Sequence, residues 1–328
     1  TGSNDKVVRL LRVPSAGTCT ASPPSRNASR VHEDNVHDTK RPEATLLRGH
    51  NGTVRDLCFP SPSPLPSAAT YDSSRSGAGG AHNSSGKLLS VGAGDFACRV
   101  WDVEGGVAGG GVGGERSLEP LVVYRGHTDT VFSCSLLPGG EIAVTGGADA
   151  VVRVWDSRTG TGVRSLVVEG KEVLCVRPWP GDPERLVATS HSDGYCFLWD
   201  MRTGRALSSV LHHTDQTRAL DFSPNGHALL TASYDGLVGV CDCRGQDNGQ
   251  APAAVPPPPA SPNANANGGA VPSVSVSVLA MLRAHGGRVL QARWRPSGPP
   301  AFLTSSTDCT VMLWSLPERT AAGGRGSG

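Results

Sequence analysis

The residues with the most chemical potential are a histidine, a threonine and an aspartate that recur at fixed spacing. In the middle of the chain they are His127, Thr145 and Asp149. An imidazole, a hydroxyl and a carboxylate of this kind could form a hydrolytic triad, in which the histidine takes a proton from the nucleophile. A catalytic set occurs once and lies in a cleft, however, whereas this set is repeated along the chain. The sequence therefore favours a structural role and predicts that the protein is not an enzyme.

The repeated unit is an aspartate followed six residues later by tryptophan or another apolar residue. The copies are Asp95 with Trp101, Asp149 with Trp155, Asp193 with Trp199, Asp308 with Trp314, and the degenerate pairs Asp235 with Cys241 and Asp5 with Leu11. Four residues before the aspartate stand Thr1, Thr145, Thr189, Thr231 and Thr304, or Val91 in the Asp95 copy. The upstream histidines are His50, His127, His213 and His285, and one copy has Lys171 instead. Six copies in one register predict a repeat protein.

Each unit has runs rich in β-branched residues, such as VFSCSL, EIAVTG and VVRVWD, separated by turn residues. This pattern predicts one small antiparallel sheet per unit, and such sheets bury both faces only when several are arranged as blades. The segment RGHTDTVFSCSLLPGGEIAVTGGADAVVRVWD (125–156) closely resembles WD-repeat proteins. The resemblance implies an all-β WD-repeat β-propeller. It also implies that the His, Asp, Thr and Trp of each blade form a hydrogen-bonded chain.

Six blades are visible in the sequence, and the first is truncated because Thr1 already occupies the position of a second strand. We expect the chain to be a fragment of a longer one, in which further residues complete a seven-bladed ring. Residues 1–316 are assigned to the propeller and 317–328 to a flexible tail.

Low-complexity insertions rich in Gly, Pro, Ser and Ala interrupt the propeller at 14–44, 60–86, 103–119 and 244–275. Their composition cannot bury a core, so mobile loops are expected. All four fall in connections between the first and second or the third and fourth strands of a unit, which emerge on one face of a propeller. The opposite face is therefore predicted to be the rigid one.

Charge and cysteine content exclude several classes of function. The chain has 30 Lys and Arg against 29 Asp and Glu, a net charge of +1, so no overall field attracts nucleic acid or a membrane. No run of about 18 apolar residues is present, and a cytoplasmic protein is expected. The nine cysteines lack C-x-x-C spacing. Cys241 and Cys243 alternate on a strand without a second ligand pair, so no metal, cofactor or small-molecule substrate is predicted.

Candidate partner-binding residues lie on the face without insertions. The position five residues after the repeat histidine, together with its aligned copy, holds Arg55, Phe132, Leu174, Arg218 and Leu290. Phe96 and Tyr234 come from the turns between the second and third strands. Arginine and aromatic side chains dominate interface energetics, so this face is predicted to bind a protein partner. For the two leucines, an alternative is that they cap the central channel.

Several segments also resemble nemitin-type, microtubule-associated WD-repeat proteins, namely TGSNDKVVRLLRV (1–13), GTVRDLCF (52–59), LLSVGAGD (88–95), ALLTASYDG (228–236), LQARW and FLTSSTDCTVMLW (290–314). The insertions and Trp101 depart from that family. The resemblance implies a protein–protein interaction scaffold of the cytoskeleton, at microtubules or in the cilium or flagellum. Its partners would be microtubule-associated or axonemal proteins.

The alternative function is a substrate receptor for a cullin-type ubiquitin ligase. WDSR (155–158) and WDMR (199–202) match the W-D-x-R pattern associated with adaptor docking, in which Arg158 and Arg202 would contact the adaptor. The same pattern is frequent in WD repeats, where the arginine simply begins a turn.

Overall fold

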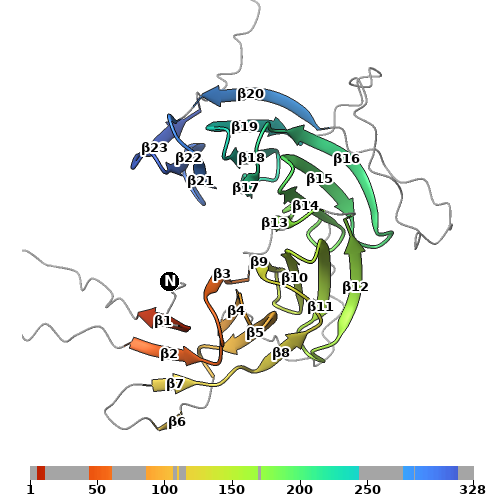
Figure 1. The fold of residues 1–328 in the computed structure, drawn as a ribbon, viewed down its shortest axis with the longest axis vertical. Coiled ribbons are helices and arrows are strands. Elements are labelled where there is room, and N and C mark those ends of the chain that lie inside the picture. The colour runs from red at the N-terminus through yellow and green to blue at the C-terminus, as the bar shows by residue number, and fades with distance from the viewer. Residues whose placement is uncertain are drawn as a thin grey trace, which may run out of the picture.

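A computed structural model describes residues 6–11, 44–60, 86–105, 109–110, 116–168, 171–243, 276–283 and 285–316. Over these ranges the regular structure is β-strand, gathered into six sheets. The sheets follow one another around an arc that is open between the first and the last (Figure 1). This arrangement confirms the predicted all-β propeller.

We number the sheets as blades in chain order and call their strands a to d from the centre outward. Blade 2 comprises β3 (Val54–Cys58), β4 (Lys87–Gly92), β5 (Ala97–Asp102) and β8 (Val122–Arg125). Blade 3 comprises β9 (Val131–Leu136), β10 (Ile142–Gly147), β11 (Val151–Asp156) and β12 (Gly162–Val167). Blade 4 comprises β13 (Val173–Pro178), β14 (Leu186–His191), β15 (Tyr195–Asp200) and β16 (Arg205–His212). The innermost strands β3, β9 and β13 border the centre of the arc (Figure 1).

Blade 5 comprises β17 (Thr217–Phe222), β18 (Ala228–Ser233), β19 (Leu237–Asp242) and β20 (Ser277–Arg283). Blade 6 has three strands within the described residues, β21 (Val289–Trp294), β22 (Ala301–Ser306) and β23 (Val311–Ser315). In blades 2 to 6 every strand pairs antiparallel with its neighbour, as a chain that turns back after each strand requires. The predicted strand runs of blade 3 are confirmed, since VFSCSL is β9 and VVRVWD is β11.

Blade 1 is built differently from the others. It contains β1 (Val7–Leu11) and β2 (Ala44–Arg48), and then β7 (Arg116–Leu118) and β6 (Gly109–Gly110), which come from the connection between strands c and d of blade 2. Strand β7 pairs parallel with the outer edge of β2. Leu118 is 5% exposed and belongs to the same core cluster as Leu47 and Trp101.

The expectation that insertion 103–119 buries no core is therefore wrong for its last residues. The glycines dominate its composition, but the segment ends on an apolar leucine, and the free edge of β2 offers hydrogen-bonding groups for one more strand. We call β7 (Arg116–Leu118) the strap. The other predicted insertions lie largely outside the described residues, as do the tail, Thr1 and Asp5.

The core lies between consecutive blades. In each case strands b and c of one blade pack against strand a of the next, as Val144 and Val152 of blade 3 pack with Val173 and Val176 of blade 4. Covering each sheet by its neighbour buries its apolar face without any long-range strand crossing.

Blade 6, the last sheet, is the exception to this packing between consecutive blades. Leu303, Val311 and Leu313 of blade 6 are 48%, 70% and 71% exposed, whereas the residues at the same positions in blades 2 to 5 are between 0% and 7% exposed. Those counterparts are Leu89, Cys98, Val100, Val144, Val152, Val154, Ala188, Cys196, Leu198, Leu230, Val238 and Val240. No described strand covers this face, which has the composition of a blade interface.

Candidate functional site

The repeated histidine, threonine and aspartate meet in three dimensions within single blades. In blade 3, His127 Nδ1 lies 2.9 Å from Asp149 Oδ2, and its Nε2 lies 2.8 Å from Thr145 Oγ1. Trp155 Nε1 donates to the same Thr145 hydroxyl at 2.9 Å. The groups are satisfied in series if the indole donates to the hydroxyl, the hydroxyl to Nε2, and Nδ1–H to the carboxylate.

Blade 6 repeats this chain, and blade 5 repeats its His–Asp–Thr part with Cys241 in place of the tryptophan. His213 lies 3.0 Å from Asp235 and 2.7 Å from Thr231. His285 lies 3.0 Å from Asp308 and 2.8 Å from Thr304, and Trp314 donates to Thr304 at 3.0 Å. Leaving one of these buried groups unpaired costs about 1–3 kcal/mol, so each chain ties the turn before strand a to strands b and c.

Blade 2 reaches the same result with different residues. His50 Nε2 and Trp101 Nε1 both contact Ser90 Oγ at 2.7 Å, so Ser90 rather than Val91 holds the threonine position. Arg99 Nη1 lies 2.5 Å from Asp95 Oδ2 and 2.9 Å from His50 Nδ1. Because the guanidinium can only donate, Nδ1 must accept, and we assign His50 the opposite tautomer from His127.

Blade 4 lacks the usual histidine, and two residues divide its role. Lys171 Nζ forms an ion pair of 2.7 Å with Asp193. His191, which lies on strand b itself, contacts Thr189 Oγ1 at 2.7 Å, and Trp199 donates to the same hydroxyl at 2.7 Å. The repeat pattern did not indicate His191, because it stands outside the histidine position and only the fold brings it to Thr189.

The electrostatics of these chains follow from their burial and partners. Burial alone would raise the pKa of Asp149, but hydrogen bonds from His127 and from the backbone N–H of Thr128 lower it below its ordinary value. Burial lowers the pKa of His191 to about 4 because the charged imidazolium would lose its hydration. His191 is therefore neutral at physiological pH.

The predicted partner-binding residues Arg55, Phe132, Leu174, Arg218 and Leu290 share one structural position. Each is the second residue of its strand a, and the strand pairing skips it in every blade from 2 to 6. A residue skipped in this way is a β-bulge, which frees the side chain from the ladder and re-aims it. We call these five the bulge residues; their strands border the centre of the arc (Figure 1).

The bulge residues differ in how far they are available to a partner. Arg55 is exposed, Phe132 and Arg218 are half-buried, and Leu290 is 37% exposed. Leu174 is only 4% exposed, which contradicts its assignment as a contact residue and agrees with the alternative that it closes the channel.

The two aromatic residues of the b–c turns remain accessible. Phe96 is 36% exposed and has a φ of 49°, a left-handed conformation that Ala150, Gly194, Gly236 and Cys309 adopt at the same position of blades 3 to 6. The left-handed turn is therefore a feature of the repeat, and Phe96 is the bulkiest residue found there. Tyr234 is half-buried, and the guanidinium of Arg288 lies 5.1 Å from its ring centroid.

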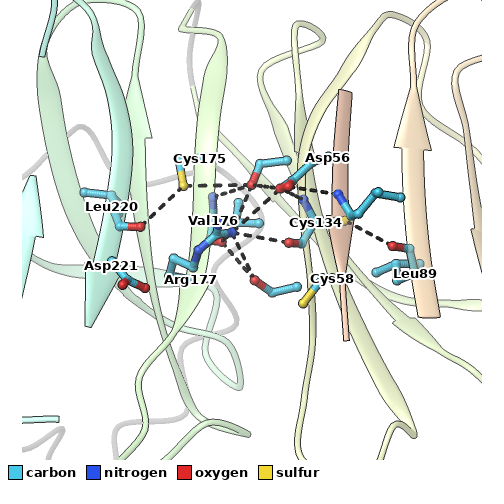
Figure 2. Close-up of polar contacts among 12 residues, drawn as sticks. Asp56, Cys58, Leu89, Cys134, Cys175, Val176, Arg177, Leu220 and Asp221 are labelled. Atoms are coloured by element: carbon cyan, nitrogen blue, oxygen red, sulfur yellow. Dashed lines mark hydrogen bonds and ion pairs between the residues drawn. The ribbon is translucent and has the colours of Figure 1, made fainter. Parts of the chain in front are cut away.

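Polar contacts between blades stiffen the strands that carry the bulge residues. Asp56 of β3 accepts hydrogen bonds from Ser133 Oγ at 3.0 Å and from Cys134 N at 3.1 Å, both on β9. Arg177 of β13 donates to the Cys134 carbonyl at 3.3 Å and lies 3.8 Å from Asp56 (Figure 2). A similar contact joins blades 5 and 6, where Asp221 of β17 accepts from Trp294 N and pairs with Arg293, which stands at the same position of β21 as Arg177 does of β13.

Arg158 and Arg202, the predicted adaptor contacts, lie at the other end of the strands. Each follows a strand c, and each backbone N–H donates to the aspartate two residues earlier at 2.8 Å. The Arg158 side chain is 66% exposed, 3.7 Å from Glu141, and Arg202 is exposed. In an antiparallel blade the c–d turn and the start of strand a are at opposite ends, so the two candidate interfaces occupy opposite faces.

Metal binding, thiol chemistry and membrane insertion have little support in the described part of the chain. It contains no group of three or more His, Cys, Asp or Glu side chains that could hold a metal ion. Its cysteines are free thiols, and burial raises the pKa values of several, including Cys98 and Cys241. Within the same residues, no helix has the length and apolar character needed to cross a bilayer.

Comparison with known proteins agrees with this architecture. Residues 118–156, 161–200, 204–242 and 276–315 match the family described as WD domain, G-beta repeat. Each matched segment contains four complete strands, namely strand d of one blade followed by strands a, b and c of the next. Fold and matches together place the chain in the WD-repeat β-propeller family.

Individual relatives have diverse roles. The chain is 30% identical over 225 residues to autophagy-related protein 16 of Arabidopsis thaliana, covering 67% of this chain and 35% of the relative. It is 26% identical over 133 residues to COMPASS component SWD3 of Saccharomyces cerevisiae, with coverage of 38% and 42%. It is 28% identical over 170 residues to nuclear distribution protein PAC1 of Coccidioides posadasii, with coverage of 46% and 33%. The matches thus extend over less than half of each of these relatives.

Proposed function

We propose that this chain is a cytoskeletal scaffold that recruits microtubule-associated or axonemal proteins through the bulge residues. The observation that carries the interaction role is the recurrence of one bulged position in five consecutive blades, which gathers Arg55, Phe132, Arg218 and Leu290 at one end of the innermost strands. Rigid strands held by contacts between blades lose little entropy on binding. WD-repeat propellers serve as interaction scaffolds, and this chain has the same kind of platform.

The cytoskeletal setting rests on the resemblance of GAGD (92–95), TGSNDK (1–6) and the accompanying segments to nemitin-type proteins. We propose that the protein acts in the cytoplasm at microtubules, in the cilium or flagellum. The near-neutral net charge favours contact through a partner protein over a grip of the whole domain on an acidic polymer. We assign no catalytic step to the His–Asp–Thr chains, because the same buried set recurs in several blades.

A second candidate function is supported by one observation, the exposure of both Arg158 and Arg202 on the opposite face. Arginines at these positions are free to contact the adaptor of a cullin-type ubiquitin ligase. In that case the bulge residues would hold the substrate, and the two faces would work together.

The two candidates are separated by a pull-down with the tagged chain from a lysate of ciliated cells. We expect recovery of tubulin-associated proteins, lost in an Arg55→Ala, Arg218→Ala variant with an unchanged melting temperature. The loss should amount to about 2 kcal/mol or more of binding free energy, as for hot-spot residues. An Arg158→Ala, Arg202→Ala variant is the matched control and should bind normally. Recovery of a cullin adaptor, abolished by that control variant instead, would move the function to the second candidate.

A further inference from the structure

Two arginines from separate blades converge on one aromatic ring. The Arg55 guanidinium carbon of blade 2 lies 6.0 Å from the centroid of Phe132 of blade 3, and that of Arg218 of blade 5 lies 5.5 Å from the same centroid. We call these three residues the arginine pair and its ring. Within the described residues, neither guanidinium has a hydrogen bond or an ion pair.

This arrangement leaves positive charge uncompensated. Each guanidinium gains from the negative face of the phenyl ring, but the ring carries no net charge and does not neutralise either one. Two like charges held near one ring repel each other, and an anion between them would remove that repulsion.

The carboxylates of Asp56 and Asp221 already accept hydrogen bonds from other groups. Asp56 follows Arg55 in the chain, yet its Oδ2 accepts from Ser133 and Cys134 across the blade interface, and its Oδ1 accepts from the N–H of Leu57. Asp221 accepts from the N–H of Trp294 at 2.7 Å. Turning either carboxylate toward the arginine pair would break contacts that hold two blades together.

We propose that the arginine pair binds the acidic side chain of an extended peptide, with the carboxylate between Arg55 and Arg218 and the peptide's methylene groups against Phe132. Guanidinium groups match carboxylate and phosphate oxygens in geometry, and such charge-assisted bonds are the strong ones. Leu290, exposed at the same position of blade 6, offers an apolar contact to the flanking residue. This inference rests on the proposed function and names the chemistry of the partner that the bulge residues select.

A phosphorylated side chain offers the same anionic oxygens as a glutamate. The pair would hold either source, and a direct comparison of peptides identifies which one binds better. The contact is made by side chains at the surface, so added salt should weaken it.

The test is fluorescence anisotropy with the whole chain and labelled peptides of equal length. One peptide alternates glutamate with glycine, a second has glutamine in place of glutamate, and a third carries a single phosphoserine among glycine and serine. We expect the glutamate peptide to bind, and the glutamine peptide to bind at least about tenfold more weakly. Tighter binding of the phosphoserine peptide would also support the anion site and would assign phosphorylation as its source.

The matched variants are Arg55→Gln with Arg218→Gln, and Arg164→Gln at an exposed arginine of the outer strand β12. The first should weaken glutamate-peptide binding by at least about tenfold, and the second should change it by less than about twofold. The inference is overturned if none of the peptides binds, if glutamine and glutamate peptides bind equally, or if the double variant binds like the parent chain.

A Phe132→Ala variant in the pull-down separates two outcomes, namely failure of the anion site and failure of the proposed scaffold function. If recovery of tubulin-associated proteins depends on Phe132 while no acidic peptide binds, the scaffold function stands and the anion site does not. If acidic peptides bind but no tubulin-associated protein is recovered, the anion site stands and the cytoskeletal function does not.

Discussion

Lowering the pH from about 7.5 to about 5 is expected to destabilise the fold through His191. Burial lowers the pKa of this imidazole from its ordinary 6.5 to about 4. The unfolded chain therefore takes up a proton as the pH falls through 6.5, while the folded chain does not do so until about 4. The stability contributed by the neutral imidazole is complete above 6.5 and is lost between 6.5 and about 4.

The size of the loss follows from the two pKa values. At about pH 5 the imidazole is protonated in almost all unfolded molecules and in few folded ones. This difference lowers the free energy of unfolding by about 2 kcal/mol. Asp193 and Lys171 act on His191 in opposite directions, so their ion pair leaves burial as the main cause. Carboxylates with lowered pKa values, such as Asp149, lose their contribution only below about pH 4 and do not add to this window.

The assay is urea unfolding, followed by circular dichroism, at several pH values for the parent chain and for His191→Gln. The variant removes the titrating group, so it should be less stable at about pH 7.5, and the difference should shrink by about 2 kcal/mol at about pH 5. His227→Gln, at an exposed histidine of the next blade, is the matched control and should follow the parent at every pH. A constant difference between parent and His191→Gln across the range would refute the reasoning, because the buried imidazole would then titrate equally in both states.

Three further predictions concern the packing. His127→Ala should lower the free energy of unfolding by about 1–3 kcal/mol, because it removes one hydrogen bond from each of two buried partners, Asp149 and Thr145; a change below about 0.5 kcal/mol in urea unfolding would show that the histidine is dispensable. Leu118→Ala in the strap should cost about 2–5 kcal/mol, and Leu121→Ala, at a 56% exposed leucine, less than about 0.5; equal costs would mean that the strap does not pack. Leu230→Ala should cost at least about 2 kcal/mol more than Leu303→Ala at the same position of blade 6, and similar costs would show that the blade 6 face is covered in solution.

The sequence was sufficient for the blades because their pattern is local. Strand runs with alternating apolar residues, tight turns and a histidine–aspartate spacing all lie within about 40 residues. The offset from the repeat histidine therefore located four bulge positions, and alignment of the blade without that histidine located the fifth. Counting residues back from the aspartate gave the wrong hydroxyl position in blade 2, where the hairpin has a different length. The turn between β4 and β5 is one residue longer than its counterpart in blade 3, so four residues before Asp95 the count reaches Val91, whereas the hydroxyl comes from Ser90.

Other features could not be derived because they depend on distance in space. His191 replaces an imidazole that other blades supply from the preceding turn, and only the folded sheet brings it to Thr189. The strap was assigned as a loop on composition, since no local pattern says that three residues after a glycine run will pair with a strand of the preceding blade. Asp56 and Arg177 likewise lie on different blades, and only the fold brings them to 3.8 Å.

The bulge explains how one fold can hold a constant framework and a variable surface. The residue just before each bulge residue is Val54, Val131, Val173, Thr217 or Val289, and all are between 0% and 4% exposed. These side chains fill the space between blades, so their size and shape are constrained. The bulge residue next to each has no ladder partner and is free to be arginine, phenylalanine or leucine. Substituting Arg55 should therefore alter binding and leave stability unchanged, whereas substituting its neighbour Val54 should alter stability first, and any effect on binding should follow from that loss.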